Sequence, residues 1–245
     1  MNRFFYQQKQ REGKTVVLSG DDAHHAARVL RVKAGELLEL CDEEGSCHRA
    51  RVDKVSPDRV RCTLLETLPC TEARTKIDLA FGLLKGEKTD FVLQKTTELG
   101  VQNFLPFTSE RTVVKLAGKQ EARLQRWQKI IRSAAAQAHR SVIPGISLPQ
   151  KFPELLSAFP LYDLVLLFWE AEQYVSLAAA MQQLEKPARI LLITGPEGGL
   201  SASEVEAAKA AGAKAVTLGP RILRAETAAI TAVALCLYQV GDLGG

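Results

Sequence analysis

Two different patterns of apolar and polar residues meet near residue 70 of the chain. Before that point, short apolar runs of strand length are separated by turns rich in glycine, serine, proline and aspartate. One helical segment, residues 22–31, interrupts them after an entry at residues 19–21. The strands predicted here are residues 15–18, 37–40, 48–52 and 59–65. Residues 1–70 are therefore predicted to form a small β-barrel-like domain.

After a break at residues 68–74, apolar runs of strand length alternate with longer segments of helical periodicity. The nearly all-apolar run 161–169 is typical of a strand buried on both faces of a parallel sheet. The predicted strands are 77–84, 103–106, 161–169, 190–193 and 215–218, and the predicted helices are 87–99, 116–140, 174–184, 202–211 and 226–240. Such alternation favours an α/β domain with a mainly parallel sheet, which we expect over residues 74–245.

The composition is that of an ordinary globular protein, with 46% hydrophobic and 24% charged residues among 245. The longest strongly apolar run, residues 164–169, is far too short to span a bilayer. No apolar stretch precedes a small-residue cleavage site near the amino terminus, so no secretory signal is predicted. We expect a cytoplasmic protein with no membrane partner.

The cysteines do not form a recognisable metal or disulfide pattern. There are five, at positions 41, 47, 62, 70 and 236, and no two are spaced as CxxC. Cys41, Cys47 and His48 match no standard zinc spacing, so no metal is expected. Free thiols in a reducing compartment are the expected state.

Positive charge is concentrated in the middle of the chain. Residues 71–150 hold 13 basic and 7 acidic side chains, whereas the whole chain carries a net charge of only +4. Residues 111–140 contain eight basic residues and a single acid, Glu121. Spacings of three and four from Lys119 onward place the basic residues on one face of the predicted helix. A solvated helix face would explain the spacing, but the near absence of acids favours a phosphate-contacting surface.

Two glycine-containing loops follow predicted strands in the second half of the chain. Residues 194–199 read TGPEGG, and residues 218–228 read LGPRILRAETA. Loops at the carboxyl ends of strands are where α/β sheets usually hold a small ligand. Ser201 and Glu204 form a capping box, which starts a helix directly after the first loop. No Lys-Ser/Thr pair follows and the pattern is not GxGxxG, so neither a P-loop nor a dinucleotide fold is predicted.

Both loops closely resemble the cofactor loops of SPOUT-class RNA methyltransferases, in particular the bacterial enzymes that methylate N3 of a uridine in 16S ribosomal RNA. The resemblance continues through NRFF at residue 2, HHAARVLR at 24, KTTELGV at 95, PFTSER at 106 and residues 126–144, and so covers essentially the whole chain. It implies a PUA-like RNA-binding domain over 1–70, followed by an α/β methyltransferase domain over 74–245 with a carboxyl-terminal trefoil knot. It also implies S-adenosylmethionine as cofactor, a homodimer, and 16S ribosomal RNA as substrate, either as free RNA or within the small ribosomal subunit.

The resemblance also implies roles for individual residues of this chain. Arg224 would stabilise developing charge, while Glu226 and Glu197 are the available carboxylates, each as proton acceptor or as a group that orients an arginine or caps a helix. Cofactor contacts would come from Leu167, Phe168, Thr194, Gly195, Gly198, Gly199, Leu218, Gly219, Ile222, Leu223, Thr227 and Ala228. RNA contacts would come from Arg3, His24, Arg28, Arg31, Arg111, Arg132 and Arg140. For His24, Arg28 and Arg31, ordinary solvated surface positions are an equally good interpretation.

Two other functions are compatible with the same sequence. A SPOUT methyltransferase could act on another RNA nucleotide, such as a ribose hydroxyl or a transfer RNA base. An RNA-binding ribosome assembly factor could keep the fold and lack the chemistry, although the intact pair of loops argues against it. Cofactor binding distinguishes the enzyme from the assembly factor. The identity of the methylated nucleoside distinguishes a uridine-N3 methyltransferase from one that acts on another nucleotide.

Overall fold

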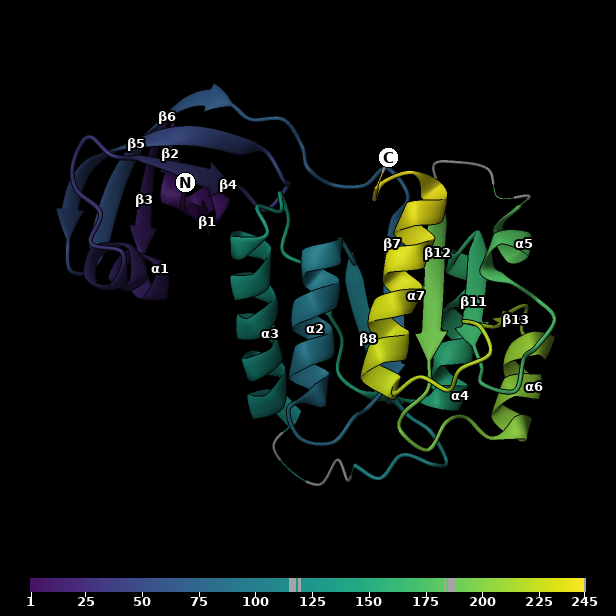
Figure 1. Ribbon diagram of the computed structural model, residues 1–245. Helices are drawn as coiled ribbons and strands as arrows, with labels where there is room; N and C mark the ends of the chain where they lie inside the picture. Colours follow the sequence, from purple (N-terminus) through teal and green to yellow (C-terminus); the bar gives the residue numbers. More distant parts are fainter. Residues whose placement is uncertain (115–117, 119, 183, 185–187, 245) are drawn as a thin grey trace. The chain divides into compact units, whose positions relative to one another are not determined.

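The computed structural model describes residues 1–114, 118, 120–182, 184 and 188–244. The chain forms two compact units (Figure 1). The first contains Met1–Glu72 and Ala135–Ile143, and the second contains Ala73–Ala134 and Pro144–Gly245. The segment 135–143 therefore belongs with the amino-terminal part, although it lies within the range 74–245 that the sequence assigns to the second domain.

A six-stranded sheet forms the first unit, in the order β1-β4-β5-β6-β3-β2. β1 pairs with β4 in parallel and the other pairs are antiparallel. The strands are β1 (Arg3–Phe5), β2 (Arg11–Glu12), β3 (Thr15–Ser19), β4 (Leu37–Cys41), β5 (Cys47–Ser56) and β6 (Arg59–Thr67). The four predicted strands are found as β3 to β6. β1 and β2 were not predicted, because three and two residues are too few to show a period.

Short helices close the first unit. The 3-10 helix η1 (Gln8–Gln10) precedes β2, and α1 (Gly20–His24) continues directly into the π-helix η2 (His25–Val29), where one longer helix was predicted. Strict alternation along β3 and β6 sends one set of side chains into the core, namely Val16, Leu18, Val60, Cys62 and Leu64. The intervening residues of these strands face outward.

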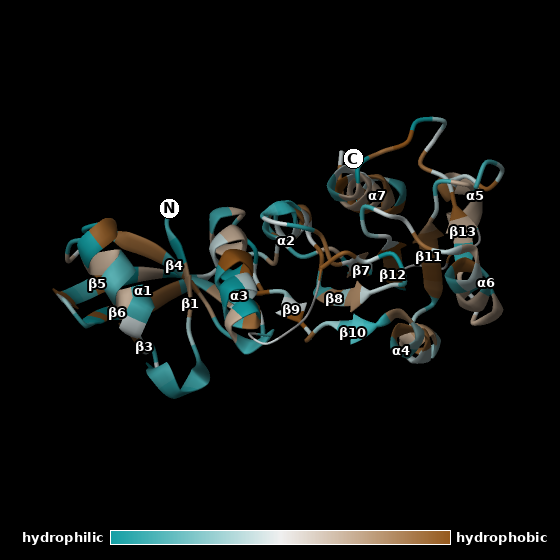
Figure 2. Cartoon of the chain, turned by 90° about the horizontal axis from the view of Figure 1, so that it is seen from below, coloured by the Kyte–Doolittle hydropathy of each residue, from teal (hydrophilic) through white to brown (hydrophobic). Residues whose placement is uncertain are grey.

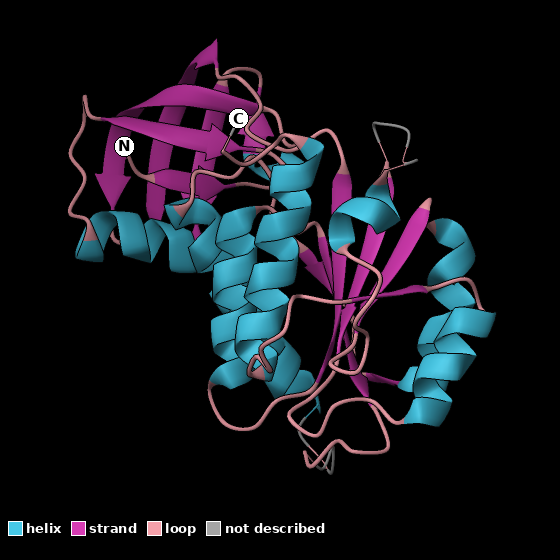
Figure 3. Ribbon diagram, turned by 45° about the vertical axis from the view of Figure 1, so that its right-hand side comes forward, coloured by secondary structure: helices cyan, strands magenta, loops and turns pink. Residues whose placement is uncertain are grey.

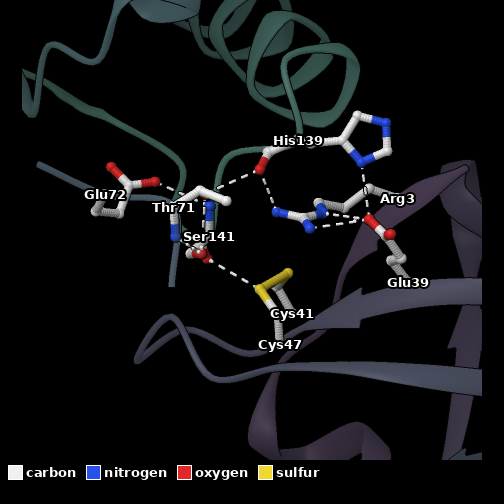
Figure 4. A network of polar contacts seen from close by, with 8 residues as sticks. All are labelled: Arg3, Glu39, Cys41, Cys47, Thr71, Glu72, His139 and Ser141. Carbon is white, nitrogen blue, oxygen red and sulfur yellow. Dashed lines mark hydrogen bonds and ion pairs between the residues drawn. A yellow bond between two sulfur atoms is a disulfide. The ribbon is translucent and has the colours of Figure 1, made fainter. Parts of the chain in front are cut away.

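A polar network fixes segment 135–143 to the sheet of the first unit (Figure 4). The Arg3 guanidinium lies 2.9 Å from the Glu39 carboxylate and also donates to the backbone carbonyl of His139. The imidazole Nδ1 of His139 lies 2.8 Å from the same carboxylate. Burial alone would raise the pKa of Glu39, but the hydrogen bonds and charges of His139 and Arg3 outweigh it and lower that pKa.

A second ion pair beside this network is almost fully buried. Arg140 Nη2 lies 2.5 Å from Glu72 Oε2, and the two side chains are only 5% and 6% exposed. The backbone N–H of Ser141 donates to the other Glu72 oxygen at 2.8 Å. Since a buried carboxylate is costly without partners, these groups hold each other in one arrangement.

The structure corrects the expectation of free thiols at Cys41 and Cys47, which form a disulfide. They occupy directly paired positions of β4 and β5, with their Cα atoms 4.0 Å apart, and both are buried. The hairpin between them places the two residues opposite each other, a pairing that their spacing alone does not reveal. Cys62, Cys70 and Cys236 take part in no disulfide. Among the described residues, no group of three or more potential metal ligands is found.

The second unit contains a seven-stranded parallel sheet in the order β10-β8-β7-β12-β11-β13, with β9 paired to β8. Its strands are β7 (Lys76–Gly82), β8 (Asn103–Thr108), β9 (Gly145–Ile146), β10 (Gln150–Lys151), β11 (Leu164–Phe168), β12 (Arg189–Thr194) and β13 (Lys214–Val216). All five predicted strands are present. Every residue of β11 is buried, and Figure 2 colours this strand as strongly hydrophobic.

Helices flank both faces of this sheet (Figure 3). They are α2 (Lys88–Leu99), α3 (Gln120–Gln137), α4 (Phe152–Leu155) followed by the 3-10 helix η3 (Leu156–Leu161), α5 (Leu177–Met181), α6 (Ala202–Ala210) and α7 (Ala225–Val240). The predicted helix 174–184 is reduced to α5, and the predicted start of the long helix at residues 116, 117 and 119 lies outside the described residues. No described helix is long and apolar enough to cross a membrane.

Candidate functional site

A pocket of about 980 Å³ opens at the carboxyl ends of β11, β12 and β13. Its walls come from the two glycine-containing loops, from the segment after β11 and from the first turns of α2 and α7. Because the strands are parallel, the loops that follow them emerge at one edge of the sheet. The sequence prediction that the two loops form one site is consistent with this arrangement.

Close backbone packing holds the first loop, residues 194–199. A Cβ atom on Gly82, the last residue of β7, would lie 2.4 Å from both the nitrogen and Cδ of Pro196. A Cβ on Gly198 would lie 2.9 Å from the carbonyl oxygen of Arg111, and one on Gly195 would lie 3.2 Å from the backbone of Gly199. Only glycine permits these approaches, so the loop backbone forms the pocket wall directly.

The second loop, residues 217–224, turns at a glycine and leads into α7. Gly219 has a φ of +105° and donates its N–H to the hydroxyl of Thr217 at 3.1 Å. Arg224 occupies the N-cap position of α7 and is exposed at the pocket. Ile222, which was predicted to contact the cofactor, is 88% exposed.

One lysine links three elements around the pocket. Lys88 Nζ, in the first turn of α2, lies 3.6 Å from Glu197 of the first loop and 3.5 Å from Glu226 at the start of α7. The backbone N–H of Lys85 also donates to Glu197 at 3.0 Å. Burial alone would raise the pKa of Glu197, but Lys85 and Lys88 outweigh it and lower that pKa.

The segment after β11 adds two carboxylates to the pocket. Glu172 accepts the backbone N–H groups of Tyr174 and Val175, and these hydrogen bonds lower its pKa. The carboxylate of Glu170 lies against Gly199, where a Cβ atom would be 2.5 Å from Oε1. The sequence analysis missed Lys88, Glu170 and Glu172. No motif in the sequence marks them, and only their position beside the strand ends brings them to the site.

Most of the residues predicted for the cofactor line the pocket. The exceptions are Leu167, which is 1% exposed within β11, and Thr227, which does not face the pocket. The lining set contains Phe168, Thr194, Gly195, Gly198, Gly199, Leu218, Gly219, Ile222, Leu223 and Ala228. Two of the three residues predicted for chemistry, Glu197 and Arg224, also line the pocket. The third, Glu226, is paired with Lys88, which lines it.

The residues predicted for RNA contact do not share one environment. His24, Arg28 and Arg31 are exposed on and after α1 and η2. Arg111 is exposed and donates to the carbonyl of Gly198 at 3.3 Å, whereas Arg132 is partly buried in α3. Arg3 and Arg140, which were also predicted to contact RNA, are enclosed in the ion pairs of the first unit, with side chains only 3% and 5% exposed.

Known proteins share both units of the chain. Residues 71–237 match a family described as RNA methyltransferase domain, and residues 18–65 match one described as RNA methyltransferase PUA domain. Ribosomal RNA small subunit methyltransferase E of Bacillus subtilis is 34% identical over 254 positions, covering 100% of this chain and 99% of that protein. The chain belongs to the ribosomal RNA small subunit methyltransferase E family.

Solved structures of this family have the same fold. The Neisseria gonorrhoeae member, bound to S-adenosylmethionine, matches with a TM-score of 0.86 and 33% identity over 97% of both chains. A Legionella pneumophila methyltransferase with bound S-adenosylmethionine matches with a TM-score of 0.85 and 30% identity over 96% of both chains. The predicted PUA-like domain and SPOUT-type α/β domain are thereby confirmed, and the trefoil knot stays a prediction.

The packing of Gly82 generates a test of the pocket. We expect Gly82→Ala to push the Pro196 loop away, costing about 1–3 kcal/mol, and to weaken S-adenosylmethionine binding about tenfold or more. Titration calorimetry and thermal unfolding measure the two effects. Gly212→Ala is the matched control, since Gly212 has a φ of +103°, no atom near its Cβ position and no part in the pocket. It should lower stability without changing cofactor affinity, and unaltered binding by Gly82→Ala would contradict the assignment.

Proposed function

We propose that this chain transfers a methyl group from S-adenosylmethionine to N3 of a specific uridine in 16S ribosomal RNA, within the assembled small subunit. The pocket between the two glycine loops carries the proposal, because it lies where the sequence predicts the cofactor site. Relatives at 33% and 30% identity have been solved with this cofactor bound. The location that we propose for the activity is the cytoplasm.

The residues of the pocket fit this cofactor. The glycine-lined wall lets a ligand approach backbone N–H and C=O groups, which can recognise the edge of an adenine. Leu218 and Leu223 supply apolar contact on the opposite loop. Within the part of the chain that the structure describes, the buried hydroxyl of Thr194 has no hydrogen-bond partner, which leaves a polar group in the pocket lining. When bound, the cofactor supplies an electrophilic methyl group on sulfur.

Uridine N3 carries a proton, so it becomes nucleophilic only as that proton leaves and negative charge spreads to the flanking carbonyl oxygens. Arg224 is suited to stabilise this charge. Its guanidinium is always protonated, it stands at the N-terminus of α7, and it faces the pocket from an exposed position. We therefore assign Arg224 the electrostatic role.

The two candidate proton acceptors differ in their surroundings. Glu197 has a lowered pKa and is held by Lys85 and Lys88, so it is a weak base whose better use is to fix the first loop to α2. Glu226 lies in the first turn of α7, two residues after Arg224, and its only described charge partner is Lys88 at 3.5 Å. We assign Glu226 the role of proton acceptor, directly or through a water.

RNA contacts are proposed for the exposed members of the predicted set. His24, Arg28 and Arg31 offer donors on the first unit, and Arg111 offers one beside the first loop. Contacts of this kind position the RNA backbone without specifying its sequence. The target uridine would leave its stack to reach the pocket.

A homodimer is also proposed. α7 buries Val233 and Leu237 toward the sheet, yet it exposes Leu235 by 42% and Tyr238 by 64%. Exposed apolar side chains on a helix beside a site are typical of a subunit interface. Light scattering should give a mass of twice 26.8 kDa for the active species, and an active monomer would contradict the dimer.

Methyl transfer from labelled S-adenosylmethionine tests the function directly. Unmodified small subunits, naked 16S ribosomal RNA and bulk transfer RNA are offered as substrates, and the products are identified by nucleoside mass spectrometry. We expect N3-methyluridine, with the highest yield on the subunits. Another methylated nucleoside would support the methyltransferase assignment but contradict uridine N3 as the target. Absence of both cofactor binding and transfer would refute the enzyme.

The role of Arg224 gives a sharper expectation in the same assay. Arg224→Ala should lower turnover about 10²–10³-fold, the usual effect of removing one donor to a developing charge, with little change in cofactor affinity. Arg221→Ala is the matched control, since Arg221 is also an exposed arginine of the second loop at the pocket. It should retain most activity. Equal losses in the two variants would point to a general charge effect instead.

A further inference from the structure

A second hollow lies on the first unit, and none of the residues predicted for RNA contact lines it. It has a volume of about 380 Å³ and is formed by the outer face of β3 and β6 together with η1 and β2. We call it the β3–β6 groove. Its lining residues are Lys9, Gln10, Arg11, Glu12, Thr15, Val17, Ser19, Arg59 and Arg61.

The floor of the groove is basic because of strand periodicity. In β6, Val60 and Cys62 point into the core, so Arg59 and Arg61 project from the opposite face. Their register partners on β3 are Ser19 and Val17, which share that face. On the other side of Arg61, β5 contributes exposed Lys54 at the directly paired position. Three cations thus stand together on adjacent strands.

The wall of the groove is held in place by hydrogen bonds. The side-chain amide of Gln10 donates to the carbonyl of Val17 at 3.2 Å and to the hydroxyl of Ser19 at 3.3 Å. Arg11 Nε donates to the carbonyl of Gly13 at 2.9 Å. These contacts fix η1 and β2 across the edge of β3. The backbone that carries Lys9 and Arg11 is therefore held in place beside the floor before any ligand arrives.

The positive charges of the groove are not neutralised by acidic residues of its lining. Among the described residues, Lys9, Arg11, Arg59 and Arg61 form no ion pair, and Glu12 is the one acid in the lining. Asp53 on the neighbouring strand β5 accepts the hydroxyl of Thr63 at 2.6 Å and lies 3.4 Å from Arg51. Uncompensated cations with neighbouring hydroxyl groups, those of Thr15 and Ser19, fit a chain of phosphates.

We propose that the β3–β6 groove binds the sugar–phosphate backbone of the RNA substrate. This inference rests on the proposed function, because it names a further contact surface for the same RNA. Ser19 lines the groove and is also the N-cap residue of α1, so the groove ends where the acidic first turn of α1, with Asp21 and Asp22, begins.

Salt dependence of RNA binding tests the groove. The full-length protein is titrated with a fluorescently labelled single-stranded RNA and with small ribosomal subunits over a range of salt concentrations. Each phosphate contact contributes about 0.7 to the slope of log K against log salt for single strands. For Arg59→Gln/Arg61→Gln we expect the slope to fall by about 1.4 and the affinity to fall about tenfold at moderate salt. Arg59→Lys/Arg61→Lys should keep the slope, since it keeps both charges.

The matched control is Lys14→Gln/Lys33→Gln, which removes two exposed charges of the first unit that do not line the groove. It should leave the slope nearly unchanged. Circular dichroism melting and S-adenosylmethionine affinity, unchanged in every variant, show that folding and the pocket are intact. Equal slopes for wild type and Arg59→Gln/Arg61→Gln would overturn the proposal that the β3–β6 groove binds RNA.

The two proposals fail in different ways. If wild-type protein methylates ribosomal RNA while the groove variant binds RNA as wild type does, only the groove is refuted. If the slope falls as expected in Arg59→Gln/Arg61→Gln but the wild-type protein methylates nothing, the groove proposal stands and the proposed reaction is refuted. Wild-type protein that binds no RNA overturns both.

Discussion

The contact between Pro196 and Gly82 is the constraint on which the pocket depends. A Cβ atom at residue 82 would lie 2.4 Å from the ring and nitrogen of Pro196, so the loop after β12 reaches its place only because β7 ends in a glycine. Gly198 and Gly195 also pack closely, with a Cβ atom 2.9 Å from Arg111 at the first and 3.2 Å from Gly199 at the second. Backbone fixed against backbone gives a rigid wall, and a rigid wall holds a ligand without losing much entropy.

Charged side chains around the pocket connect the elements that form its walls. Lys88 lies 3.6 Å from Glu197 and 3.5 Å from Glu226, and it thereby joins α2, the first loop and α7. This leaves Arg224, at the N-cap of α7, as a cation directed to the pocket. A positive charge at a partly enclosed site stabilises developing negative charge more than a charge in bulk water does.

Burial divides the arginines of this chain into two groups with different roles. Arg3 and Arg140 are enclosed with Glu39 and Glu72, where they fix segment 135–143 to the sheet of the first unit. Arg59 and Arg61 stand on the outer face of the same sheet. A guanidinium with its donors already satisfied cannot bind phosphate at the same time. The tertiary partners, rather than the residue type, therefore decide which arginines remain for RNA.

The sequence by itself determined the strand and helix pattern, the two-part organisation and the pair of loops, because periodicity and glycine position are local properties of a chain. It also led to the family, which the relatives confirm. Only the tertiary structure decided that Lys88 and Glu170 join the pocket, that Cys41 meets Cys47, and that Arg3 and Arg140 turn inward. Each of these depends on which strands pair and in which register. Contacts between residues far apart in sequence leave no periodic trace, so they become visible only when the chain has folded.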